Sequence, residues 1–116
     1  MRVMSFYKPA NPLSGPPSAE HMETMGRFAT EMTKKGHLIA AGGFLSAAPI
    51  SASLKNDQFG VHESAGAIVR DGFHGFGIIQ ADSNEELMDI VKQFLHVAGD
   101  GECLLHPLME GPPQPQ

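Results

Sequence analysis

The sequence lacks several features on which secreted, membrane and nucleic-acid-binding proteins depend. It has no tryptophan and a single cysteine, Cys103. Because a disulfide needs two cysteines, none can form within the chain. Its 8 lysines and arginines are outnumbered by 13 acidic residues, which leaves no basic stripe to contact phosphates. No apolar run approaches the roughly 18–20 residues that span a bilayer. We therefore expect neither nucleic-acid binding nor insertion into a membrane.

What remains is typical of one small domain. The chain has 116 residues, 41% of them hydrophobic, and a second core would not fit in that length. We expect a single domain over residues 1–109. Residues 110–116 are rich in Pro and Gln and have almost nothing to bury, so we expect a mobile tail. The first residues lack the order of a secretory signal, which favours the cytoplasm.

Hydrophobic periodicity predicts two helices among several strands. Ser18 caps a helix that Gly36 ends, and Ser83 with Glu86 forms a capping box for the second helix. The nearly continuous apolar run at 37–44 predicts a buried strand with a bulge or close approach at its glycine end. The full set is a strand at 2–8, a loop at 9–17, a helix at 18–35, a strand at 37–44, a hairpin at 49–61, a loop or short helical turn at 62–72, a strand at 74–81, a helix between Ser83 and Gly99, and a strand at 102–109.

This order of elements predicts an α+β fold. Two amphipathic helices in a chain dominated by strands pack on one face of a mainly antiparallel sheet, as in ferredoxin-like, split βαβ domains. The other face of the sheet then needs a cover. In so short a domain a second copy covers it most economically, so we expect a homodimer that closes two sheets into an α+β barrel.

Four segments carry a resemblance that spans nearly the whole chain. They are residues 16–22 (PPSAEHM), 36–43 (GHLIAAGG), 75–83 (GFGIIQADS) and 106–109 (HPLM). In this order and spacing they resemble the YCII-related family, specifically its DGPF branch. The Asp-Gly-Pro-Phe signature of that branch is replaced here by Glu-Ser-Ala-Gly at residues 63–66.

The resemblance has consequences for fold and activity. It implies a ferredoxin-like, dimeric α+β barrel in a family whose members mostly lack assigned activities. In some relatives a histidine near the start of the first helix transfers protons on small, often aromatic, substrates, and His21 occupies the matching position. The pair Arg70-Asp71 resembles the Lys-Glu that usually follows the branch signature.

His21 is also the first candidate on the residues alone. Met25, Phe28 and Met32 lie 4, 7 and 11 positions further on, so the imidazole is expected on the helix face that meets the sheet. The positive end of the helix dipole favours a neutral ring, which suits a general base. The same position equally suits a histidine that is hydrogen-bonded at a helix start and has no catalytic task.

Other residues are candidates to complete such a site. Asp71 would orient the imidazole of His21, and Arg70 would hold an anionic or phenolate substrate. An exposed pair of charges on a surface turn is the alternative reading of Arg70 and Asp71. Tyr7 and Phe44 would wall an aromatic substrate, and His74 would line the same cavity.

Metal and nucleotide motifs are missing from the sequence. It has no H-x-H, H-E-x-x-H or C-x-x-C spacing, so we expect no metal and no cofactor; a site assembled from His21, His74 and His106 is the alternative. The glycines of residues 72–77 lead into a strand and do not follow the G-x-G-x-x-G order, which disfavours nucleotide binding.

Two functions are compatible with these features. The first is a cofactor-free lyase or isomerase that moves a proton on a small aromatic or anionic metabolite, with His21 as acid or base. The second is a non-catalytic domain that binds a small molecule or a protein partner.

Overall fold

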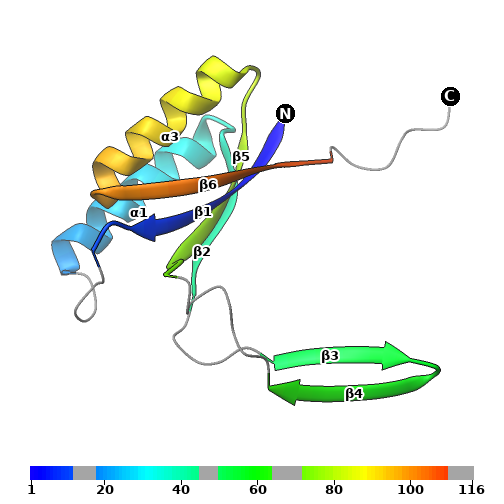
Figure 1. Cartoon of the computed structure of the whole chain (residues 1–116). Coiled ribbons are helices and arrows are strands. Elements are labelled where there is room, and N and C mark those ends of the chain that lie inside the picture. Colours follow the sequence, from blue (N-terminus) through cyan, green and yellow to red (C-terminus); the bar gives the residue numbers. More distant parts are fainter. Residues whose placement is uncertain (12–17, 45–49, 64–71, 110–116) are drawn as a thin grey trace, which may run out of the picture.

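A computed structural model describes residues 1–11, 18–44, 50–63 and 72–109 (Figure 1). The predicted C-terminal tail and most of the predicted loops at 9–17 and 62–72 lie outside these residues. The elements are β1 (Arg2–Pro9), α1 (Ala19–Lys34), β2 (Leu38–Gly43), β3 (Ile50–Lys55), β4 (Gln58–Glu63), β5 (Gly75–Gln80), α3 (Asn84–Ala98) and β6 (Gly101–Leu108).

Four strands form the main sheet, in the order β2-β5-β1-β6. Every neighbouring pair is antiparallel, and Phe6 of β1 is paired with Phe76 of β5 on one side and Leu104 of β6 on the other. Both helices lie on the same face of this sheet (Figure 1). The predicted α+β, ferredoxin-like class is confirmed.

The core lies between the helices and the sheet. Val3 of β1 is 1% exposed, because alternate residues of a strand point to the same face and this face meets α3. Each fully buried side chain of this kind contributes about 1.5–3 kcal/mol to folding. The buried cluster consists of Val3, Ile79, Ala81, Leu87, Ile90 and Val91.

Both helices begin at the predicted caps. Ser18 accepts a hydrogen bond from the backbone N–H of His21 at 3.1 Å, and Ser83 accepts one from the N–H of Glu86 at 3.1 Å. These bonds satisfy donors that the first turn of a helix otherwise leaves without partners. Gly99 ends α3 with a φ of 108°, a conformation that favours glycine.

The prediction that residues 37–44 form a buried strand is wrong. Among the described strands, β2 lies at the edge of the sheet and pairs only with β5, so Leu38 is half-buried and the rest of the strand is exposed. The predicted close approach at its glycine end is present, because a Cβ on Gly42 would lie 2.9 Å from Cε1 of Phe76. The register shift between Leu38 and Ala40 lies at the opposite end of the strand.

The predicted hairpin is confirmed and forms a sheet of its own. Its turn, Asn56-Asp57, has φ values of 50° and 61°, as a tight two-residue hairpin turn requires. β4 continues to Glu63, two residues beyond the predicted end. In Figure 1 the hairpin projects from the end of the main sheet. No helix in the described part of the chain is long and apolar enough to cross a membrane.

Candidate functional site

The main sheet has one face under the helices and one that no described element covers. We call the second the open face. Pairing and alternation place Phe6, Phe76 and Leu104 on it, opposite the buried side chain of Val3. The open face also carries Arg2, Met4, Lys8, Ile78, Glu102 and His106.

Four aromatic rings, Phe6, Phe44, Phe73 and Phe76, form a phenylalanine cluster at one end of the open face. The ring of Phe6 lies 6.5 Å from that of Phe44, nearly parallel at 16°, and 6.0 Å from that of Phe73. Phe44 in turn lies 5.7 Å from Phe76. Nζ of Lys8 lies 5.7 Å from the centre of the Phe73 ring. This arrangement offers apolar ring surfaces with a cation beside them, which suits a planar, anionic aromatic molecule.

Three of the predicted substrate-binding residues, Tyr7, Phe44 and His74, are joined by backbone hydrogen bonds at the end of the sheet that carries the cluster. The backbone N–H of His74 donates to the carbonyl oxygen of Tyr7 at 2.8 Å, and the N–H of Phe44 donates to the carbonyl oxygen of His74 at 2.9 Å. The sequence predicts that Tyr7 and Phe44 wall an aromatic substrate and that His74 lines the same cavity, and this stays a prediction. The backbone bonds fix their order across the sheet.

The ring of Tyr7 nevertheless points away from that of Phe44. It packs against Phe94 of α3 at 5.3 Å, and its hydroxyl donates to the carbonyl oxygen of Gly99 at 3.2 Å. Tyr7 therefore lies on the helix face while Phe44 lies on the open face, so the two rings do not wall one cavity. Burial raises the pKa of Tyr7, and the negative charges of Cys103 and Asp100 raise it further.

His21 occupies the first turn of α1, on the side that faces the domain. His21 and Phe28 are half-buried and Met32 is buried, whereas Met22 is 60% exposed. The ring of Phe28 lies 6.1 Å from Phe94 of α3, which fixes the inward side of the helix. This agrees with the orientation expected from the sequence.

The predicted partners of His21 cannot be placed beside it. Arg70 and Asp71 lie outside the described residues. The other predicted histidine, His74, is exposed and belongs to the open face by alternation with Phe76, whereas His21 lies in the helix layer. The combination of His21 with Asp71 therefore stays a prediction.

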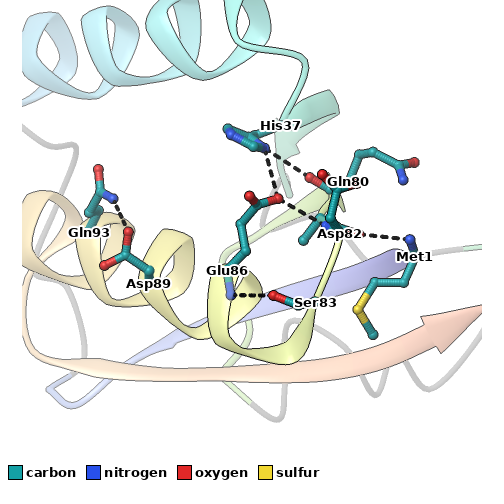
Figure 2. Close-up of polar contacts among 9 residues, drawn as sticks. Met1, His37, Gln80, Asp82, Ser83, Glu86, Asp89 and Gln93 are labelled. Atoms are coloured by element: carbon teal, nitrogen blue, oxygen red, sulfur yellow. Dashed lines mark hydrogen bonds and ion pairs between the residues drawn. The ribbon is translucent and has the colours of Figure 1, made fainter.

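A histidine–carboxylate pair that sequence reasoning missed joins His37 and Glu86 (Figure 2). Nδ1 of His37 lies 3.8 Å from Oε1 of Glu86 and donates to the carbonyl oxygen of Gln80 at 3.1 Å. The same carboxylate oxygen accepts from the backbone N–H of Asp82 at 2.9 Å. The pair ties the start of β2 to the start of α3. The capping-box spacing indicated a structural role for Glu86 at the start of the helix. Nothing in the sequence linked that residue to His37.

The alternative metal site is not assembled in the described part of the chain. His106 lies on the open face and its Nδ1 donates to the carbonyl oxygen of Pro107 at 2.9 Å, while His21 lies in the helix layer. Among the described residues, no three His, Cys, Asp or Glu side chains are grouped so that they could hold a metal ion.

Two surface depressions of the described residues lie on the helices. One runs along the outer surface of α1 from Glu23 to Lys34, and the other lies beside α3 between Met88 and Gly101. Both are open to solvent, and none of the candidate residues lines either of them. Among the described residues, no helix or strand covers the phenylalanine cluster on the open face.

The fold and this site define a ferredoxin-like α+β domain with an uncovered aromatic sheet face. The structure is similar to that of 5-chloro-2-hydroxyhydroquinone dehydrochlorinase from Burkholderia phenoliruptrix, solved in complex with 2,5-dihydroxybenzoquinone. The match has a TM-score of 0.52 at 16% identity and covers 96% of both chains. No family model and no curated protein matches the sequence. The likeness supports the YCII-like fold, and assignment to the DGPF branch stays a prediction.

Proposed function

We propose that this protein binds a small hydroxylated aromatic or quinonoid compound and transfers a proton on it without a cofactor, as a lyase or isomerase. The single observation that carries the proposal is the phenylalanine cluster with His74 beside it. A planar ring stacks on aromatic surfaces in offset or edge-to-face geometry, and each such pair adds about 0.5–1.5 kcal/mol beyond the area it buries. A solved protein of the same fold is in complex with 2,5-dihydroxybenzoquinone, a compound of this class.

Charge around the cluster supports an anionic form of the ligand. Lys8 lies over Phe73 beside the cluster, and Arg2, held by a hydrogen bond from its Nε to Oε1 of Gln80 at 3.0 Å, adds positive charge at the opposite end of the same face. Phenolates and hydroxyquinones carry negative oxygen at neutral pH, which such cations attract. Arg70, the predicted anion-binding residue, would add to this attraction.

His21 is the proposed acid or base, with Asp71 orienting its ring, for a ligand that extends from the cluster past the end of the sheet where β1 ends and α1 begins (Figure 1). A neutral imidazole accepts a proton from the substrate, and the resulting imidazolium returns it to the product, so the histidine is restored in each cycle. A carboxylate partner would fix the tautomer of the ring and stabilise its charged form. The half-buried, inward position of His21 supports this role.

One observation favours binding without turnover as a second candidate. Among the described residues, the histidine that lies against a carboxylate is His37, and no described carboxylate pairs with His21. A domain that binds its ligand on the phenylalanine cluster, without a carboxylate to orient a catalytic histidine, would bind the ligand and not convert it. Turnover assays on a compound that binds separate the two candidates.

Thermal unfolding with 2,5-dihydroxybenzoquinone as the probe tests the proposal. A ligand at about a hundred times its dissociation constant adds about 2.7 kcal/mol to stability, which is a readily measured rise in Tm. We expect that rise in the wild type and in His96→Ala, whose side chain is exposed on α3, and its loss in His21→Ala. No rise in the wild type overturns the proposal, and a full rise in His21→Ala removes His21 from the site.

A homodimer is part of the same proposal. The open face exposes apolar side chains that monomeric proteins normally cover, and Leu104 is 55% exposed on it. A second copy brings the same surface in two-fold symmetry, which is the usual arrangement of small homodimers.

A further inference from the structure

The β3–β4 hairpin, residues 50–63, has one apolar face that nothing in the described chain covers. We call this hairpin the arm. Leu54 is paired with Phe59, and Ala52 with Val61, so these side chains point to one side, while Ser51, Ser53 and His62 point to the other. The large apolar side chains are Ile50 (73% exposed), Leu54 (69%), Phe59 (71%) and Val61 (57%).

This exposure is unusual for a surface hairpin. Isolated two-stranded hairpins are marginally stable in water, and they persist when an apolar face packs on something. Fully exposed side chains of this size present about 150–200 Å² each, so the four exposed fractions leave roughly 450 Å² uncovered. Among the described residues, β3 and β4 pack against each other and no helix or other strand covers them.

The area fits docking on a second copy of this chain. Two arms related by a two-fold axis, each burying a matching area on the partner, would remove about 1,800 Å² from water. Stable interfaces bury about 1,200–2,000 Å². The open face is the matching surface, because it carries the phenylalanine cluster and the exposed side chain of Leu104.

Charge favours the same pairing. The described arm carries two carboxylates, Asp57 and Glu63, and one cation, Lys55. The open face carries two cations and one carboxylate: Arg2, Lys8 and Glu102. Opposite net charges on two apolar surfaces steer them together and disfavour the pairing of one arm with the other.

We propose that in the homodimer the arm of each copy lies across the open face of the other copy and closes the ligand site over the phenylalanine cluster. Leu54 and Phe59 of one copy then form the roof of a site whose floor belongs to its partner. The site is then incomplete in a single chain, because its floor and its roof come from different copies. This inference deepens the proposed function and rests on it for the identity of the ligand.

Paramagnetic broadening between subunits tests the arrangement without any ligand. Gln58→Cys in a Cys103→Ala background accepts a spin label on the polar side of the arm, away from the proposed contact. The labelled protein is mixed with unlabelled, ¹⁵N-enriched wild type so that mixed dimers form. Broadening of the amides of Phe6, Phe76 and Leu104 in the ¹⁵N subunit supports the proposal. Broadening only of arm amides, only of helix amides, or of none overturns it.

Substitution of the arm gives an independent readout. Leu54→Ser with Phe59→Ser is expected to shift sedimentation from dimer to monomer and to weaken binding of 2,5-dihydroxybenzoquinone at least tenfold. Met22→Ser with Met88→Ser removes apolar side chains of comparable exposure from the helices and is the matched control. An arm variant that stays dimeric and binds normally refutes the proposal. If the wild type does not bind the probe, the proposed function fails, and the spin-label experiment still decides the position of the arm.

Discussion

Nδ1 of His37 lies 3.8 Å from Oε1 of Glu86, so the side chain that closes the first turn of α3 also meets the start of the edge strand β2. The carboxylate of Glu86 therefore contacts both the start of the helix and the start of the edge strand. Its other contact, the hydrogen bond from the N–H of Asp82 at 2.9 Å, holds the chain where it enters the helix.

Glu86→Ala is expected to destabilise the fold by about 1 kcal/mol, as loss of a capping interaction typically does. Glu86→Gln keeps an acceptor for the N–H of Asp82 and should cost less. Glu85→Ala is the control, because Glu85 is an exposed acidic residue of the same turn. Urea unfolding measures the differences, and equal losses for Glu85→Ala and Glu86→Ala would contradict this role.

Gly101, at the start of β6, lies too close to β1 for a side chain. A Cβ there would lie 2.5 Å from the carbonyl oxygen of Lys8 and 3.0 Å from Cα of Pro9, both backbone atoms that cannot move aside easily. Gly101→Ala should therefore destabilise by about 1–3 kcal/mol.

Gly26→Ala is the matched control for Gly101→Ala. Gly26 lies inside α1, and a Cβ there meets nothing within 4 Å. The substitution should stabilise the protein by about 0.8–1 kcal/mol, the difference in helix propensity. Thermal unfolding of both variants is the measurement, and the same sign of change in both would show that the spacing at Gly101 is wrong.

Stability should fall in alkaline solution because of two groups beneath the helices. Burial raises the pKa of Cys103 above its ordinary value of 9.0, against a smaller lowering by the hydrogen bond with Ser5. Burial also raises the pKa of Tyr7 above 10.0, and the negative charges of Cys103 and Asp100 raise this pKa further. The folded state therefore keeps protons that the unfolded state has lost.

The resulting stabilisation is complete below about pH 9 and decreases as the pH rises past 9 and then past 10. Cys103→Ala should flatten the first part of this decline and Tyr7→Phe the second part. Urea unfolding at a series of pH values between neutral and strongly alkaline conditions measures the slopes. A decline of the same steepness in both variants and the wild type would show that other groups cause it.

The sequence predicted those features of the fold that depend on local chemistry. Ser18 and Ser83 marked both helix starts, and the hairpin was predicted at 49–61, because caps and tight turns are made by residues adjacent in the chain. The burial of β2 was predicted wrongly, since an apolar run indicates a strand but not whether that strand lies in the middle of a sheet or at its edge. Strand order is set by pairing between distant segments.

The site was predictable to a smaller extent. Backbone hydrogen bonds join Tyr7 to His74 and His74 to Phe44, but the face to which each ring points depends on strand parity, which places Tyr7 under the helices. The contact between His37 and Glu86 joins residues 49 positions apart, and a single sequence contains no signal for such a distance.

The most direct test of the account is a titration of the ¹⁵N-labelled protein with 2,5-dihydroxybenzoquinone followed by amide chemical shifts. The account predicts that the largest changes occur at Phe6, Phe44, Phe73 and His74, around the phenylalanine cluster. Changes confined to the outer surfaces of α1 and α3, or none at saturating ligand, would contradict it.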